Sequence, residues 1–235
     1  MAETWRILIR DGENAAPRDM TQTVARLQIT PSEAVLAEEN GETQSLTPQS
    51  VTIDFENRTI DICTSPLPTI IDYIYRRRSI RKYTSEPVDE ATIDLLLKAA
   101  MAAPSANDVR PWAFIVVREA ERRQALAKIK QWAFMCADAP VVFAVLGNPN
   151  LSDHWIEDCS AAAENLLLAA AGIGLGGVWV AIYPRSEYEK KVRTLLNIPP
   201  LWRVLCLLAV GHPAEHKPPR TRYEANKVYY ETFGG

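Results

Sequence analysis

Apolar residues in the first quarter of the chain alternate with polar ones at a spacing of two, which is the period of a β-strand. The pair Asn40-Gly41 lies between two strand-like runs and favours a tight hairpin turn. A second turn separates the alternating apolar residues of 51–55 from those of 60–62. These patterns predict a β-rich N-terminal extension over residues 1–66, and nothing in them assigns it a role.

The pattern then changes to helical stripes of apolar residues alternating with short apolar runs. The stripes predict helices from Asp89 to about Pro104 and over 119–134, 158–171 and 186–197, and the runs predict strands over 111–117, 139–147, 178–184 and 203–211. Asp89 is a typical N-cap, and Ser186 with Glu189 forms the pattern of a capping box. We therefore predict a second domain over residues 67–235 of the α+β or mixed α/β class.

Composition removes several classes of function. The net charge of −3 gives this chain of 235 residues no general attraction to nucleic acid or to anionic membranes. No apolar run reaches the roughly 20 residues of a membrane helix, and the N-terminus lacks a secretory pattern, so we expect a cytoplasmic protein. The cysteines have neither disulfide nor metal-ligand spacing, so no metal site is predicted; they are Cys63, Cys136, Cys159 and Cys206.

Gly172, Gly174 and Gly177 have the G-x-G-x-x-G spacing of a dinucleotide-binding loop. Such a loop follows a strand and opens a helix, so that phosphate meets the helix N-terminus. Here the order is reversed, because an Ala- and Leu-rich segment precedes the glycines and a β-branched, aromatic segment follows them. We predict that these glycines end a helix and turn the chain into a strand, which argues against a Rossmann dehydrogenase.

A basic cluster surrounds Ser79 and consists of Arg76, Arg77, Arg78, Arg81 and Lys82. Such a run is often only a solvated charged face, but guanidinium groups beside a hydroxyl also make a good phosphate site. Together with three further blocks, this segment resembles the FMN-dependent nitroreductases in order and spacing over residues 70–235. The four blocks are RRSIRKY, AAMAAPSANDVRPWAFIVV, DCSAAAENLLLAAAGIGLGGVWVAIYP and VGHPAEHKPPRTRYE.

The resemblance implies an α+β fold of three α/β/α layers around a central, mostly antiparallel sheet, in an intertwined homodimer with two FMN sites at the subunit interface. It implies an oxidoreductase that takes a hydride from NADH or NADPH and reduces nitroaromatic, quinone or related small acceptors by a ping-pong scheme. Two alternatives stay open: a flavin-dependent dehydrogenase that desaturates a small metabolite or peptide-like substrate, and a non-catalytic flavin-binding subunit.

The resemblance also implies which residues bind the cofactor. Those matching the positions that hold the phosphate, ribityl chain and pyrimidine edge of FMN are Arg77, Arg78, Ser79 and Arg81, with Arg222 closing on the phosphate and Arg220 as its helper. Those matching the loop that the partner subunit lays against the isoalloxazine are Pro104, Ser105, Ala106, Asn107 and Asp108. The backbone N–H groups of Ala181 and Ile182 match the donors near flavin N5.

Asp108 and Arg110 depart from the family pattern, which often has Asn and Gln there. An ionised Asp108 cannot donate a hydrogen bond, and Arg110 either pairs with it or changes the charge near the flavin. Trp132 and Trp155 are candidates for aromatic walls of an acceptor pocket or, equally, for residues of the dimer core.

Two further features point to the dimer. Glu164 and Asn165 interrupt an apolar helix, and we expect them to make a buried polar contact across the subunit interface. The aromatic residues of the C-terminal tail resemble an arm that packs on the partner; they are Tyr223, Tyr229, Tyr230 and Phe233.

Overall fold

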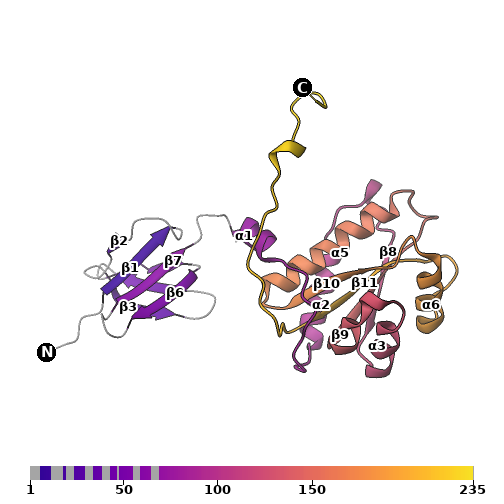
Figure 1. Cartoon of the computed structure of the whole chain (residues 1–235), viewed down its shortest axis with the longest axis horizontal. Coiled ribbons are helices and arrows are strands. Elements are labelled where there is room, and N and C mark those ends of the chain that lie inside the picture. The colour runs from indigo at the N-terminus through magenta and orange to yellow at the C-terminus, as the bar shows by residue number, and fades with distance from the viewer. Residues whose placement is uncertain are drawn as a thin grey trace. The chain divides into compact units, whose positions relative to one another are not determined.

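The structure is a computed structural model, and it divides the chain into two compact units, Met1–Asp72 and Tyr73–Gly235. Figure 1 shows the strands of the first unit and the sheet and helices of the second. The structure describes residues 6–11, 18–19, 24–29, 34–38, 43–46, 48–54, 59–64 and 69–234.

The first unit is built from strands. They are β1 (Arg6–Asp11), β2 (Arg18–Asp19), β3 (Val24–Ile29), β4 (Ala34–Glu38), β5 (Thr43–Leu46), β6 (Pro48–Asp54) and β7 (Thr59–Thr64). One sheet has the order β2-β1-β7-β6 and the other β3-β4-β5. The strands on both sides of the two predicted turns, β4 with β5 and β6 with β7, pair antiparallel as predicted, while the turn residues lie outside the described ones. Ile9 and Ile62 are buried.

The second unit is organised around one sheet of the order β10-β11-β9-β8, in which every neighbouring pair is antiparallel. Its strands are β8 (Trp112–Val117), β9 (Val141–Gly147), β10 (Gly176–Ala181) and β11 (Arg203–Gly211). The central strands β9 and β11 are buried on both faces and therefore read as continuous apolar runs. β10 lies at one edge of the sheet, which becomes important for the site.

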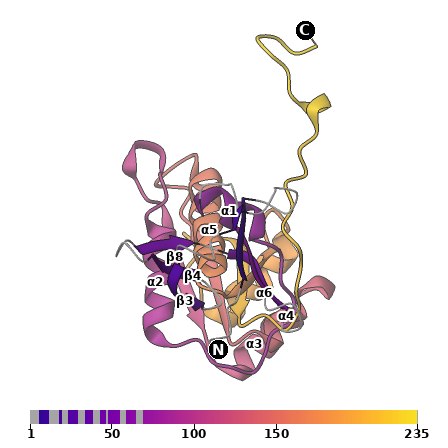
Figure 2. The same cartoon turned by 90° about the vertical axis from the view of Figure 1, so that its left-hand side faces the viewer.

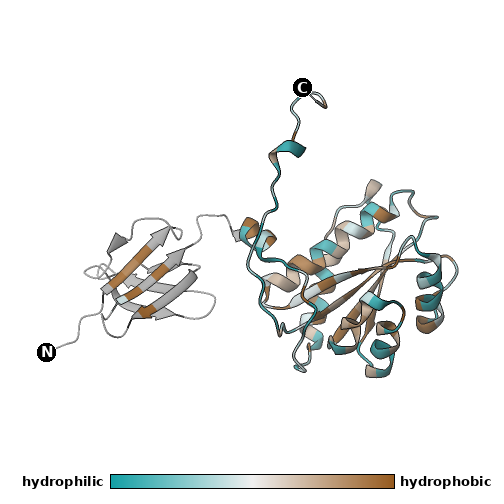
Figure 3. Ribbon diagram, viewed as in Figure 1, coloured by the Kyte–Doolittle hydropathy of each residue, from teal (hydrophilic) through white to brown (hydrophobic). Residues whose placement is uncertain are grey.

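Helices cover both faces of this sheet (Figure 1). They are α2 (Glu90–Met101), α3 (Ala120–Ala127), α4 (Met135–Asp138), α5 (Trp155–Gly172) and α6 (Ser186–Leu196). A further helix, α1 (Thr69–Arg76), precedes them in the chain. Successive strand residues point to opposite faces, so Val141 and Phe143 pack with α2 and α5, whereas Val142 and Ala144 pack with α3, α4 and α6. The predicted three-layer α+β fold with an antiparallel sheet is therefore confirmed. Figure 3 shows the apolar sheet between helices that carry hydrophilic residues.

Most predicted elements are present, but two details are wrong. Asp89 caps α2 as predicted, since its side chain accepts the Thr92 N–H at 2.7 Å. Ser186 and Glu189 form no capping box, because α6 begins at Ser186 itself and the Glu189 carboxylate binds Arg203 instead. The predicted helix over 119–134 ends at Ala127, because the chain becomes extended at Lys130.

The glycine-rich segment follows a helix and precedes a strand, as predicted. α5 ends at Gly172, and Gly174 takes a positive φ of 82°, a conformation that favours glycine. A Cβ on Gly177 would lie 2.6 Å from the Cδ2 of Leu167, so β10 packs closely on α5 at this point. These glycines therefore shape the junction between α5 and the edge strand.

The chain after β11 returns past α1 and ends in an extended segment with one short 3₁₀ turn, η3 (Ala225–Lys227). Both views show the last residues running away from the rest of the second unit (Figure 1, Figure 2). Among the described helices, none is both long enough and apolar enough to cross a membrane.

Candidate functional site

The basic segment after α1 lies along the open edge of β10. The Ile80 N–H donates to the carbonyl of Gly177 at 3.0 Å, and Ser79 forms a parallel bridge with the same residue. Residues 82–84 then pair antiparallel with 212–214, which directly follow β11. The basic segment is thus held between the edge strand and the chain that leaves the sheet.

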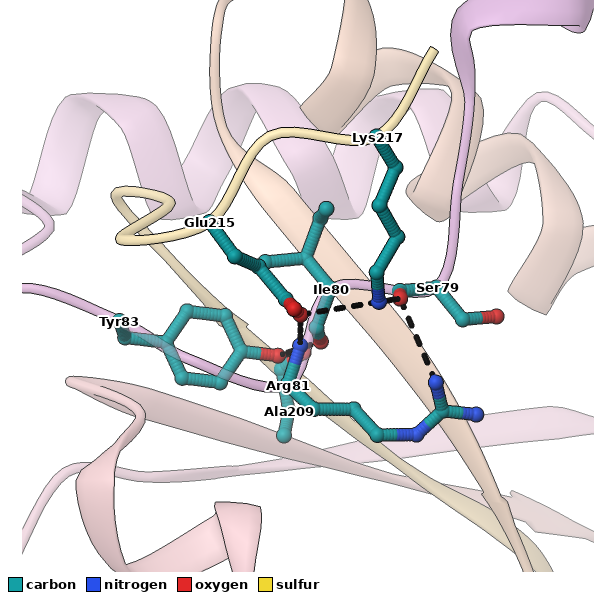
Figure 4. Close-up of polar contacts among 7 residues, drawn as sticks. All are labelled: Ser79, Ile80, Arg81, Tyr83, Ala209, Glu215 and Lys217. Atoms are coloured by element: carbon teal, nitrogen blue, oxygen red, sulfur yellow. Dashed lines mark hydrogen bonds and ion pairs between the residues drawn. The ribbon is translucent and has the colours of Figure 1, made fainter. Parts of the chain in front are cut away.

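Side chains hold the backbone of this segment where regular structure does not. The Tyr83 hydroxyl, which is half-buried, lies 2.6 Å from the carbonyl oxygen of Ile80 and 2.8 Å from that of Ala209 on β11 (Figure 4). Burial raises the pKa of Tyr83 well above its usual range, so the hydroxyl remains a neutral donor.

Glu215 and Lys217 hold the same segment from the other side. One oxygen of the Glu215 carboxylate accepts the backbone N–H of Arg81 at 2.6 Å. The Lys217 ammonium donates to the carbonyl of Ser79 and to Glu215, the latter at 2.9 Å (Figure 4). The contact of Glu215 with Arg81 joins residues 134 positions apart in the sequence, and that of Lys217 with Ser79 joins residues 138 positions apart.

Four of the predicted phosphate-binding residues lie close enough for the charges of three of them to act on the fourth, Arg220. The pKa of Arg220 is lowered, by partial desolvation and then by the positive charges of Arg222, Arg78 and Arg77. Arg77 also forms an ion pair with Glu164, at 3.0 Å between Nε and Oε1. Mutually repelling cations in one place favour an anionic ligand.

The hydrogen bonding of the Arg78 guanidinium indicates whether a phosphate group would fit in this cluster. One terminal nitrogen of its guanidinium donates to the carbonyl of Pro218. Its Nε–H is buried and has no hydrogen-bond partner among the residues that the structure describes. A buried, unsatisfied donor in a cluster of cations fits the oxygen atoms of a phosphate group.

The loop of residues 104–110 is anchored to the first turn of α5. The buried Asp158 carboxylate accepts the backbone N–H of Ala106 at 2.9 Å and the Ser152 hydroxyl at 3.2 Å. The Ser105 hydroxyl oxygen accepts the backbone N–H of Arg110 at 2.9 Å. The loop therefore has a defined shape although it contains little regular structure.

The two departures from the family pattern in this loop contact each other. The Arg110 Nε lies 3.3 Å from an Asp108 carboxylate oxygen, and both side chains are exposed. Asn107, Asp108 and Arg110 all adopt positive φ angles, between 52° and 55°. Of the two possibilities left open for Arg110, the structure has the pairing with Asp108.

The backbone N–H groups of Ala181 and Ile182, both predicted donors to the flavin, point in different directions at the edge of the sheet. The Ile182 N–H donates to the carbonyl of Leu205 at 3.1 Å, so this donor is used within the sheet. Backbone groups alternate in direction along an antiparallel strand, so Ala181 directs its N–H away from β11. Its carbonyl accepts the Lys130 ammonium at 2.6 Å on that open side.

A cavity of about 660 Å³ adjoins Ala181. Three aromatic rings line it, those of Trp132, Tyr183 and Tyr188, together with the cations Lys130 and Arg185. The Lys130 ammonium lies 5.5 Å from the centre of the Tyr188 ring, and the Trp132 side chain is exposed. These walls suit a flat, electron-poor molecule.

Trp155, the other tryptophan predicted either to line an acceptor pocket or to belong to the dimer core, does not line this cavity. It is only 5% exposed, belongs to the core beneath α5, and contacts the Tyr183 ring edge-on at 5.1 Å between centroids. The polar pair on α5 has partners within the chain, while its contact across a subunit interface stays a prediction. Glu164 pairs with Arg77, and the Asn165 amide donates to the Ala99 carbonyl at 3.2 Å.

The second unit thus combines a three-layer α+β core with an arginine cluster beside its edge strand, and such a cluster suits a phosphate-bearing ligand. The chain belongs to the nitroreductase family: the profile described as Nitroreductase family matches residues 74–137 and 130–212. The predicted family is confirmed.

Individual relatives agree with this membership. A protein of Archaeoglobus fulgidus, provisionally named NADH dehydrogenase/NAD(P)H nitroreductase, is 43% identical over 148 residues, which are 61% of this chain and 85% of that protein. The structure of an FMN-dependent nitroreductase from Clostridium difficile has 32% identity, a TM-score of 0.67, and coverage of 69% of this chain and 99% of that one. A provisionally named nitroreductase from Desulfovibrio desulfuricans, solved with FMN, has 30% identity and a TM-score of 0.62 over 71% of this chain and 99% of that one.

Four residues at this site are marked by no sequence pattern; they are Tyr83, Lys130, Glu215 and Lys217. They act on backbone groups of distant segments, and no spacing in the sequence marks such contacts. The same holds for Asp158, because its partner Ala106 lies 52 positions away.

Proposed function

We propose that this protein binds FMN, takes a hydride from NADH or NADPH, and passes the electrons to a small aromatic acceptor such as a nitroaromatic or a quinone. The predicted enzyme class, an FMN-dependent NAD(P)H oxidoreductase, is confirmed at the level of the family and of the named relatives. The observation that carries the proposal is the arginine cluster around Arg220, with the buried unsatisfied Nε of Arg78.

Different residues bind different parts of FMN. The arginine cluster, made of Arg77, Arg78, Arg220 and Arg222, holds the phosphate, and Ser79 and Arg81 contact the ribityl chain and the pyrimidine edge. Ala181 offers a backbone N–H on the open side of β10. Bound FMN supplies a ring that accepts and gives up electrons, while the chain binds it and tunes its charge. A cation beside the pyrimidine edge, as proposed for Arg81, stabilises negative charge there.

The acceptor binds in the cavity beside Ala181. Its aromatic lining from Trp132, Tyr183 and Tyr188 supports stacking of a flat molecule. Donor and acceptor use the same place in turn, which is the ping-pong scheme.

The proposed assembly is a homodimer in which the C-terminal segment packs on the partner and the loop 104–110 reaches the partner's cofactor. The aromatic side chains of the segment support this, because Tyr230 and Phe233 are 78% and 88% exposed in the single chain. We place the enzyme in the cytoplasm, which suits its buried free thiols; they are Cys136, Cys159 and Cys206.

The test is anaerobic rapid mixing of purified, FMN-loaded protein with NADH and with NADPH while the flavin absorbance is followed. We expect bleaching by one or both nucleotides and recovery of the oxidised spectrum on adding a nitroaromatic or a quinone. A bound flavin that neither nucleotide bleaches would favour a dehydrogenase of another substrate. Protein that binds no flavin would refute the proposal.

A further inference from the structure

We propose that Glu215 and Lys217 are positioning residues, which hold the backbone of Ser79 and Arg81 in the conformation that binds FMN. The inference rests on the proposed function, since it takes Ser79 and Arg81 as contacts of the cofactor. Neither Glu215 nor Lys217 needs to touch FMN for this role.

The backbone of residues 79–81 belongs to no helix or strand. Polar backbone groups that leave regular structure need other partners. Here the Ser79 carbonyl accepts Lys217, the Ile80 N–H donates to Gly177, and the Arg81 N–H donates to Glu215. Two of these three partners are side chains of the segment after β11. That segment therefore helps to set the local conformation, together with the Tyr83 hydroxyl on the Ile80 carbonyl and the Arg81 guanidinium on the Ser79 carbonyl.

The side chains of Glu215 and Lys217 also hold each other in place. Glu215 and Lys217 form an ion pair of 2.9 Å, and their side chains are only 20% and 25% exposed. Each therefore orients the other while it binds a different backbone group. Hydrogen bonding to the Arg81 N–H and to Lys217 lowers the pKa of Glu215, so the carboxylate is charged at neutral pH.

Glu215 approaches the segment from a different side than the one to which Ser79 and Arg81 direct their polar groups. Figure 4 shows the Ser79 hydroxyl and the Arg81 guanidinium on one side of the segment and Glu215 on the other. A carboxylate among the phosphate ligands would repel the phosphate, whereas a carboxylate behind the backbone does not meet it. The charge of Lys217 is neutralised by Glu215, which leaves the arginines as the cations that face a ligand.

The experiment compares FMN affinity with the stability of the apoprotein. The variants are E215A, E215Q, K217M and a control, E119A, which removes the carboxylate of the exposed ion pair between Glu119 and Arg122. The dissociation constant of FMN is measured by quenching of its fluorescence, and the midpoint of thermal unfolding is measured without FMN.

We expect E215A and K217M to weaken FMN binding about tenfold, as the loss of a charge-assisted hydrogen bond implies. E215Q keeps an oxygen that accepts the Arg81 N–H, so we expect it to stay within about threefold of the parent protein. Apoprotein unfolding midpoints should match that of E119A.

Several outcomes would overturn the inference. FMN affinity of E215A and K217M equal to that of E119A would do so, as would a loss of affinity in E215Q as large as in E215A. A loss of FMN affinity in K217M and E215Q that is matched by a lower unfolding midpoint of the apoprotein would indicate a purely structural role. If E215A fails to fold, K217M and E215Q still test the inference. Failure of the parent protein to bind FMN would instead refute the proposed function.

Discussion

The carboxylate of Asp158 accepts a hydrogen bond of 2.9 Å from the backbone N–H of Ala106. This contact joins the first turn of α5 to the loop of residues 104–110, the loop that we propose reaches the partner's cofactor. A buried carboxylate with an uncharged backbone donor therefore links the core to this loop.

We expect D158A to lower the free energy of unfolding by about 2 kcal/mol, because it removes a charge-assisted hydrogen bond and leaves the Ala106 N–H without its partner. Urea unfolding followed by tryptophan fluorescence measures this change. The control is E157A, which changes the neighbouring exposed residue on α5. Equal stability of the two variants would contradict the prediction.

The ion pair between Glu189 and Arg203 predicts a pH dependence of stability. Burial raises the pKa of Glu189, but two hydrogen bonds from Arg203 and one from the Val204 N–H outweigh it, so the net pKa is lowered. A carboxyl group with a lowered pKa in the folded state stabilises the fold above its unfolded pKa of about 4.3 and loses this contribution as pH falls through the folded value.

We therefore expect E189Q to be less stable than the parent protein by about 2 kcal/mol at pH 7, with a smaller difference below pH of about 4. Urea unfolding at several pH values measures both. A difference that stays constant from neutral to acidic pH would show that the charge of Glu189 is not responsible.

The arginine cluster predicts selectivity for the phosphate of the cofactor. We expect R222A to weaken FMN binding by about ten- to a hundredfold and to leave the affinity for riboflavin, which lacks the phosphate, unchanged. Added salt should weaken FMN binding by the parent protein, because it screens the arginines. R122A, at an exposed arginine of α3, is the control, and an equal loss for both flavins in R222A would count against a phosphate contact.

The cavity beside Ala181 predicts a preference among acceptors. Lys130 and Arg185 outweigh the one carboxylate of the lining, that of Glu187, so its net charge is positive. We therefore expect the parent protein to reduce 4-nitrobenzoate with a higher kcat/KM than nitrobenzene. K130M should reduce this ratio by about fivefold, whereas K128M, at an exposed lysine outside the cavity lining, should leave it unchanged. The same ratio in the parent protein and K130M would exclude a role for Lys130 in acceptor choice.

Local patterns predicted most of the elements of the second unit. The apolar stripe after Asp89 and the continuous apolar run of 139–147 correspond to α2 and β9, since each element buries residues at its own period. The same reasoning failed at Ser186 and Glu189, because a tertiary contact with Arg203 uses the carboxylate that a capping box would need. It failed again at 127–134, where the sequence keeps a helical spacing although the chain turns.

The sequence by itself determined the layered fold, the order of helix and glycines that argues against a Rossmann loop, and the motif residues shared with the nitroreductase family. Only the tertiary structure decided that Glu215 meets Arg81, that Asp158 meets Ala106, and that Ile182 uses its N–H within the sheet. The physical reason is that periodicity records which residues are buried along one element. A hydrogen bond between distant segments depends on how the elements pack, and that leaves no local pattern in the chain.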